Sequence, residues 1–207
     1  MNTKFIVKHL VAATTAVFTL GLISCNQTQP TSAKEEIHET IAKETPVKRG
    51  EYLVTIGGCN DCHSPKMMTQ FGPEIDSSRL LSGRPENDKL PAFDLKHLQP
   101  GNGVFFTDDL TAVAGPWGVS FPINLTPDTA TGIGAWRDEM FIKILRSGKH
   151  MGSDAARPIL PPMPWQNFAK MTDEDLKAVF TYLKSLPAIK NKAPEAFSPP
   201  EVMAMRK

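Results

Sequence analysis

The chain contains one C-x-x-C-H run, at residues 59–63. The thiols of Cys59 and Cys62 lie three positions apart, so they share one face of a helical turn. Both can form thioether bonds to the vinyl groups of a single porphyrin, and the imidazole of His63 can bind the iron as proximal ligand. A thioredoxin-like redox pair would need a βαβ context, and a zinc site would need a second pair of cysteines or histidines. The sequence contains neither pattern, so we predict one covalently bound haem c.

The third cysteine, Cys25, ends an export signal. Residues 1–24 begin with a short basic stretch, continue with an apolar run, and end in Leu-Ile-Ser directly before Cys25. The apolar run is too short to span a bilayer as a helix, which takes about 20 residues. Leu-Ile-Ser-Cys resembles the lipobox of bacterial lipoprotein signal peptides, which implies cleavage before Cys25 and lipidation of its thiol. The alternatives are an ordinary signal peptide or an uncleaved anchor.

Polar residues dominate the segment after the signal, so residues 25–46 are predicted to form a flexible tether. We expect the haem domain to face the periplasm or the exterior. Asn26 is not an aspartate, and by analogy with lipoprotein sorting in enterobacteria this favours the outer membrane. The 23 lysines and arginines nearly balance the 22 aspartates and glutamates, which argues against nucleic acid as a partner. Residues 47–207 are predicted to form one domain.

Three helices are predicted from the spacing of apolar residues. The first leads from Arg49 into the haem motif, and Gly50 or Gly57 would allow close approach of another helix. The second covers residues 135–147 and stops at a glycine. The third begins after Thr172, with Thr172 and Asp175 as a capping box, and carries apolar residues at i, i+3, i+4 and i+7.

An ordered set of motifs resembles the class I cytochromes c, and more narrowly the cytochrome c domains associated with bacterial dehydrogenases. The matching runs cover most of residues 47–190: Arg49-Gly50-x-Tyr52-Leu53, Cys59-x-x-Cys62-His63, Asn124-Leu125-Thr126-Pro127-Asp128, Thr131-Gly132-Ile133-Gly134-x-Trp136, Pro162-Met163-Pro164-Trp165 and Met171-Thr172-Asp173-Glu174-Asp175-Leu176. The resemblance implies an all-α fold around one haem, His/Met ligation of the iron, and an electron carrier.

Met163 is the predicted sixth iron ligand. It lies in the proline-rich run 157–165, where a residue before proline is pushed toward extended geometry, so its thioether would sit on a stiff loop. The resemblance implies the same ligand. A methionine that only fills the core is the structural alternative. Among other ligands Met151 comes next, then His150, and Met171 is also possible.

Residues 64–123 form a long insertion between the haem motif and the Asn-Leu-Thr-Pro-Asp run. Residues 110–121 are predicted to form two short β segments around a Gly-Pro-Trp-Gly turn. We interpret the insertion as a cover for the haem edge, with a docking surface for a dehydrogenase as the alternative. Arg84 and Trp136 could bond a haem propionate, although ordinary packing or surface roles explain both. His38 and His97 are expected to face solvent.

Taken together, these patterns favour a non-enzymatic electron carrier. The predicted partners are redox proteins, with a dehydrogenase or a terminal oxidase as the candidates, and the membrane, which the protein would contact through its lipid. One alternative is the haem subunit of a dehydrogenase complex, in which catalysis resides in another chain. A gas-binding sensor or a peroxidase-like enzyme would require an open or displaceable sixth site, which the Met163 loop argues against.

Overall fold

The structure is a computed structural model that describes residues 44–205, all of which belong to one unit spanning residues 42–207. The predicted signal peptide, Cys25, His38 and nearly all of the predicted tether lie outside the described residues. Within residues 44–205, no helix has the length and apolar character needed to cross a membrane.

Helix α2 (Pro46–Ile56) begins at a well-formed cap. The side chain of Thr45 accepts a hydrogen bond from the Lys48 amide, and proline occupies the first turn, where its missing N–H costs nothing. The helix ends at Gly57. Gly58 follows with a φ of 66°, a conformation that glycine adopts without steric cost, and it turns the chain into the short helix α3 (Cys59–His63).

Helix α6 (Asp173–Ser185) confirms the third predicted helix. The Thr172 hydroxyl accepts from the Asp175 amide at 3.1 Å, and three acidic residues favour the positive end of the helix. The predicted capping box is formed only in part. The Asp175 carboxylate pairs instead with the Arg49 guanidinium of α2, at 2.9 Å, and so links the two helices.

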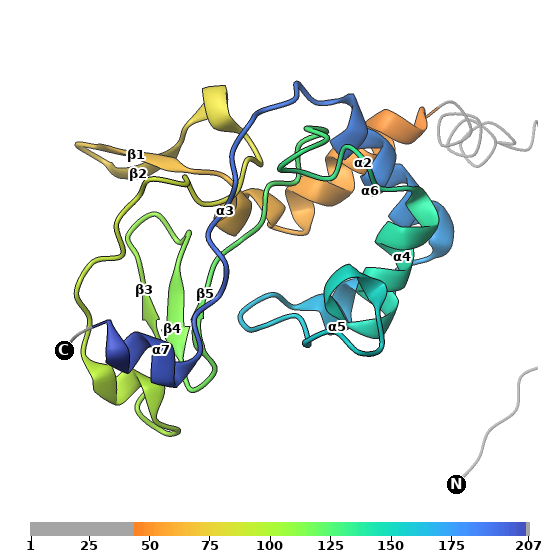
Figure 1. The fold of residues 1–207 in the computed structure, drawn as a ribbon. Coiled ribbons are helices and arrows are strands. Elements are labelled where there is room, and N and C mark those ends of the chain that lie inside the picture. The colour runs from red at the N-terminus through yellow and green to blue at the C-terminus, as the bar shows by residue number, and fades with distance from the viewer. Residues whose placement is uncertain (1–43, 206–207) are drawn as a thin grey trace, which may run out of the picture. The chain divides into compact units, whose positions relative to one another are not determined.

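Helices α2 and α6 lie side by side although they come from opposite ends of the domain (Figure 1). Gly50 allows this approach, because a Cβ at that position would overlap the carbonyl oxygen of Ala178. Gly57, the other glycine considered, instead faces helix α5 (Trp165–Phe168), where a Cβ would lie 3.1 Å from the Phe168 ring.

Helix α4 (Asp138–Ser147) starts three residues later than predicted. The Trp136 amide donates to the Ile133 carbonyl and so closes a turn before the helix. The backbone of Arg137 is still extended, so the regular helix begins only at Asp138. Gly148, with a φ of 62°, ends the helix as expected.

Five short strands form two small sheets within the described residues. Strands β1 (Lys66–Thr69) and β2 (Gly72–Ile75) make a hairpin directly after the haem motif. Strands β3 (Phe105–Phe106), β4 (Val113–Gly115) and β5 (Gly118–Ser120) form a second antiparallel sheet in the order β3-β4-β5. The β4–β5 pair confirms the two segments predicted around the Gly-Pro-Trp-Gly turn.

Short helical segments complete the chain. They are the 3₁₀ segments η1 (Ser77–Arg79), η2 (Leu95–Leu98) and η3 (His150–Gly152), and helix α7 (Pro199–Ala204). Helix α7 packs near β5, and Phe197, just before it, exchanges two backbone hydrogen bonds with Val119.

Two hydrophobic clusters divide the described domain into two regions. The helical region (residues 46–63 and 133–186) holds the larger cluster, which includes Leu176 and Leu183. The β region (residues 90–121 and 197–204) holds a second cluster around Phe93, Val119 and Val202. The domain is therefore mixed, with helices and small sheets, so the all-α class that we predicted is too narrow, although we expected the insertion at residues 64–123 to be partly β.

Candidate haem site

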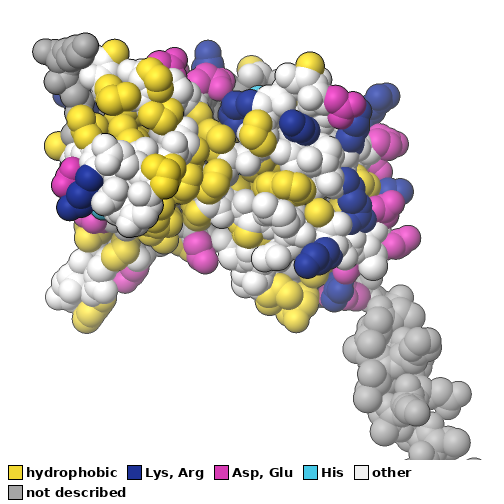
Figure 2. Space-filling model, turned by 90° about the horizontal axis from the view of Figure 1, so that it is seen from below, with side chains coloured by type: hydrophobic (Ala, Val, Ile, Leu, Met, Phe, Trp, Pro, Cys, Tyr) yellow, Lys and Arg dark blue, Asp and Glu magenta, His cyan; other side chains and the backbone are white. Residues whose placement is uncertain are grey.

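The helical and β regions share one cavity of about 200 Å³. Its walls are largely apolar and come from α2, α4, α6, the β4–β5 pair and the proline-rich loop at residues 157–163. In Figure 2, which views the molecule from below Figure 1, hydrophobic side chains gather over the middle and left of the face, and charged side chains gather toward the right. An apolar cavity with few polar groups is typical of a cofactor site.

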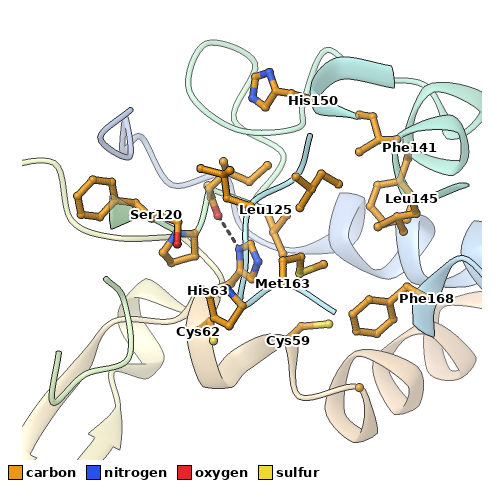
Figure 3. Close-up of a pocket in the computed structure, with 18 of the residues that line it drawn as sticks. Cys59, Cys62, His63, Ser120, Leu125, Phe141, Leu145, His150, Met163 and Phe168 are labelled. Atoms are coloured by element: carbon orange, nitrogen blue, oxygen red, sulfur yellow. Dashed lines mark hydrogen bonds between the residues drawn. The ribbon is translucent and has the colours of Figure 1, made fainter. Parts of the chain in front are cut away.

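The haem-motif residues all reach this cavity. Cys59, Cys62 and His63 line it from α3, and Figure 3 shows the two thiols at one end with the His63 ring toward the middle. Helix α3 brings this about, since its single turn places all three side chains beside the cavity. A pair of thiols and an imidazole in an apolar cavity is the donor set that a covalently bound haem requires, so these residues fit that group.

The His63 ring is held in one orientation. Its Nδ1 atom lies 2.8 Å from the carbonyl oxygen of Ile123, so Nδ1 carries the proton and donates it to that carbonyl. This leaves Nε2 with a free lone pair, which is the arrangement that orients an imidazole ligand. Burial lowers the pKa of His63, and the Ile123 carbonyl offsets this in part. The ring is therefore neutral at pH 7 and able to bind a metal.

Burial has the opposite effect on the two thiols. It raises the pKa of Cys59 to about 11 and also raises the pKa of Cys62. Both residues therefore remain protonated thiols at neutral pH in the folded chain without haem. Low thiol reactivity does not fit a thioredoxin-like pair, whose attacking cysteine needs a depressed pKa.

The carbonyl that orients His63 is fixed by the Asn-Leu-Thr-Pro-Asp run. Asn124 is buried, and its amide donates to the Ile189 carbonyl at 2.7 Å while its side-chain oxygen accepts from Thr126. The Leu125 amide donates to the Leu81 carbonyl, which ties the run to the insertion. The run thus supports the haem motif through its backbone while Leu125 lines the cavity, a role that we had not assigned to it.

Met163 lines the same cavity and is half-buried. Figure 3 shows it near the middle of the cavity, next to His63 in that view. Its loop is anchored at two points. The Ser120 hydroxyl of β5 donates to the Pro161 carbonyl at 2.6 Å, and the Ile159 amide donates to the Gly148 carbonyl at 2.8 Å. Sequence reasoning missed Ser120, because no local pattern links it to a loop 41 residues away.

The alternative ligands also line the cavity. Met151, His150 and Met171 all contribute to its walls, although Met151 is 45% exposed. Met67 and Met68 lie on strand β1 and are exposed, outside the cavity lining.

The two residues considered as propionate partners differ in position. Trp136 lines the cavity, whereas Arg84 is not among its lining residues. Arg84 is buried and donates to the Thr111 hydroxyl and to the carbonyls of Asp88 and Lys89. Its Nε atom has no hydrogen-bond partner within the described residues. His97, which we expected to face solvent, is only partly exposed. Its Nδ1 atom lies 2.9 Å from the Asn102 carbonyl oxygen in the β region.

Several characterised proteins are similar to this chain. It is 31% identical over 141 residues, 68% of the chain, to the gluconate 2-dehydrogenase cytochrome c subunit of Pantoea cypripedii, and covers 23% of that protein. It is 28% identical over 162 residues, 76% of the chain, to the alcohol dehydrogenase (quinone) cytochrome c subunit of Gluconobacter oxydans, covering 26% of it. Over 194 residues, 90% of the chain, it is 26% identical to the fructose dehydrogenase cytochrome subunit of Gluconobacter japonicus, covering 31% of that protein.

This chain therefore spans less than a third of the length of these relatives. No family model matches it. The relatives are cytochrome c subunits of bacterial dehydrogenases, and at this modest identity they support a cytochrome c domain that carries covalently bound haem c. The donor set of the cavity agrees with that cofactor.

Proposed function

We propose that this protein is a lipid-anchored monohaem c-type cytochrome that carries single electrons between redox proteins in the periplasm or at the membrane. The observation that supports it most strongly is the shared cavity. Two thiols, an oriented imidazole and a thioether all line one apolar space. When bound, the haem supplies the one-electron chemistry of its iron, which changes between ferric and ferrous states.

In this proposal His63 and Met163 are the two side chains that would bind the haem iron. His63 presents Nε2 because Nδ1 is held by the Ile123 carbonyl. Met163 presents its sulfur from a loop that Ser120 and Gly148 anchor, so little freedom is lost when the sulfur binds. A thioether ligand raises the reduction potential, and two protein ligands leave no open site for oxygen or peroxide. This argues against the sensor and peroxidase alternatives.

The partner that we propose is a dehydrogenase. The relatives are named as cytochrome subunits of gluconate, alcohol and fructose dehydrogenases, so this chain would accept electrons from a catalytic chain of that kind. It would serve either as a subunit of such a complex or as a free shuttle to another acceptor, such as a terminal oxidase. Affinity purification from native membranes, with the bound chains identified by mass spectrometry, distinguishes these two forms.

Two measurements test the haem assignment. After extraction with acid and acetone, the intact mass should correspond to the protein with one haem attached through Cys59 and Cys62. In the ferric protein, a weak sulfur-to-iron charge-transfer band should appear at the red end of the visible spectrum. Release of the haem into the solvent would contradict covalent attachment.

Replacement of individual methionines tests the sixth ligand. Met163→Ala should abolish the charge-transfer band, open the iron to added ligands and lower the potential, within the roughly 0.8 V range that axial ligands span. Met151→Ala and Met171→Ala are matched controls, because both residues line the same cavity. A band that survives in Met163→Ala and disappears in one of the controls would move the ligand to that residue.

The lipid anchor is tested separately from the haem. Cys25→Ser should leave the precursor uncleaved by lipoprotein signal peptidase and should remove labelling by a fatty-acid analogue. Two or three acyl chains would suffice for stable anchoring, because two membrane signals are the usual requirement. A wild-type protein that is exported without label would contradict the anchor and leave the haem proposal unaffected. The outer membrane, inferred from Asn26, is checked by fractionation.

A further inference from the structure

The two ends of the cavity differ in chemistry. In Figure 3 the thiols of Cys59 and Cys62 lie at one end, and the His150 ring lies at the other, beyond His63. A porphyrin of the haem type carries its vinyl groups on one edge and its two propionates on the opposite edge. A macrocycle that is bonded through both thiols therefore directs its propionates away from the cysteines, toward the end where His150 lies.

Two basic side chains meet at this end. His150 and Arg157 both line the cavity, and the backbone brings them together, because the His150 amide donates to the Arg157 carbonyl at 2.9 Å. An isolated antiparallel bridge between Lys149 and Pro158 continues this pairing. The two side chains are thus supported by a short, regular piece of backbone.

Within the described residues, the Arg157 guanidinium has no carboxylate ion-pair partner. Burial lowers the pKa of His150, and the nearby Arg157 charge lowers it further, while Glu195 acts in the opposite direction. Within the described residues, the basic side chains that form ion pairs with carboxylates are Arg49, Arg79, Lys96 and Arg146. Among residues 44–205, the hydrogen-bond acceptor of the Arg157 guanidinium is the neighbouring Pro158 carbonyl, at 3.3 Å. The charged group beside this end of the apolar cavity is therefore Arg157, and no carboxylate within the described residues pairs with it.

We propose that Arg157, assisted by His150, binds a haem propionate at the end of the cavity opposite the two cysteines. The inference rests on the proposed function, because it requires a haem bonded to Cys59 and Cys62. A carboxylate taken from water into an apolar site is costly unless a charged donor pairs with it, and guanidinium–carboxylate pairs are among the strong hydrogen bonds of proteins. Arg84, whose Nη atoms are already bonded outside the cavity lining, is not needed for this contact.

Two consequences follow for the bound haem. A pairing at its propionate edge fixes the macrocycle at the end that the thioethers do not hold. A permanent positive charge at that edge also favours the ferrous iron, whose site carries one positive charge less than the ferric site. Arg157 is thus a positioning residue that also raises the potential, although it does not touch the iron.

The test uses the full-length holoprotein with Arg157→Gln, Arg157→Lys and His150→Ala, and Arg137→Gln as control. Arg137 is exposed and does not line the cavity, so its replacement makes the same charge change away from the proposed contact. The readouts are the midpoint potential and the propionate bending band in the resonance Raman spectrum. Arg157→Gln should lower the potential more than Arg137→Gln and shift the Raman band. Arg157→Lys should restore most of the potential but not the band position, and His150→Ala should give a smaller shift of the same band.

Two results would overturn the inference. One is an unchanged Raman band in Arg157→Gln. The other is an equal fall in potential for Arg157→Gln and Arg137→Gln, which would reduce the effect to overall charge. The proposed function fails differently, through a wild-type protein without covalent haem or without the sulfur-to-iron band. Because Arg157 is an exposed residue, its variants are expected to fold.

Discussion

The helical region and the β region are built from different kinds of contact. In the helical region, most order arises within single helices, through caps such as Thr172 and through apolar stripes at helical spacing. In the β region, order depends on contacts between distant segments, such as the two backbone hydrogen bonds between Val119 and Phe197. One wall of the cavity, from the helical region, is therefore specified by local sequence patterns. The other wall, from the β region, depends on pairing of the C-terminal segment at Phe197 with β5.

The close approach of α2 and α6 is the point where the helical region also depends on a distant contact. Gly50→Val should destabilise the holoprotein by about 3 kcal/mol, because the new side chain would overlap the Ala178 carbonyl and overpacking has costs of this size. The measurement is the free energy of unfolding in guanidinium chloride. Lys48→Ala, at an exposed position of the same helix, is the control and should change stability little. Equal stability of the two variants would contradict the close crossing.

A matched pair of phenylalanines tests whether the two regions are separate. Phe93 in the β region and Phe141 in α4 are both 6% exposed. Replacement of either by alanine should cost about 3 kcal/mol. Only Phe141 lines the cavity, so only Phe141→Ala should also change the haem absorption spectrum.

Hydrogen exchange of the backbone amides measures which region loses stability when one of these two phenylalanines is replaced. Phe93→Ala should reduce amide protection in residues 90–121 and leave residues 173–185 protected. If protection falls equally in both segments, the helical region and the β region unfold as one unit, and their separation into two regions is wrong.

Ser120 joins the two regions, because its hydroxyl on β5 holds the loop of Met163. Ser120→Ala removes the short hydrogen bond to the Pro161 carbonyl, worth about 1 kcal/mol, together with the longer contacts to the Val113 carbonyl and the Trp117 indole, and should let the loop move. We expect the sulfur-to-iron band to disappear at a lower temperature than in the wild type. Ser185→Ala, which removes a hydroxyl bonded to the Tyr182 carbonyl on α6, is the control. A thermal loss of the band identical to that of the control would show that the loop does not need Ser120.

The smallest effect is expected at the run that orients His63. Hydrogen bonds from Thr131 hold the pKa of Asp128 below its usual value of 3.8. A carboxyl group with a lower pKa in the folded state stabilises the fold above about pH 4, and this contribution is lost as the pH falls through the folded-state pKa. Asp128→Asn should therefore reduce the loss of stability below pH 4, measured by unfolding at several pH values. Asp154→Asn, which makes the same charge change at an exposed loop position, is the control.

Sequence patterns predicted the helices well for a physical reason. Apolar spacing, the Thr172 cap and the stop at Gly148 act within a few residues, and the structure confirms each of them. The β4–β5 pair was also predictable, since a tight turn joins adjacent segments. The all-α class was too narrow because the β3–β5 sheet and the β1–β2 hairpin occupy the insertion, where the resemblance gave no guidance.

Local sequence patterns could not predict the contacts that orient the residues of the site. The Ile123 carbonyl that orients His63 comes from 60 residues away, and a backbone carbonyl leaves no trace in residue identity. The meeting of His150 and Arg157 likewise depends on a backbone bridge that composition does not reveal. A donor such as His63 can be named from a motif, whereas the atoms that aim it become visible only in three dimensions.

The position of α6 has a consequence for the order of events when the protein is made. Leu176, Val179 and Leu183 of α6 wall the cavity, so docking of α6 against α2 closes the space that the macrocycle must enter. Folding also raises the pKa of the Cys59 thiol to about 11, which makes it a poorer nucleophile than in an open chain. Haem attachment is therefore expected to come before the last helix docks, while the motif is still exposed. A chain truncated before residue 173 should then still acquire its haem, although it cannot complete the fold around it.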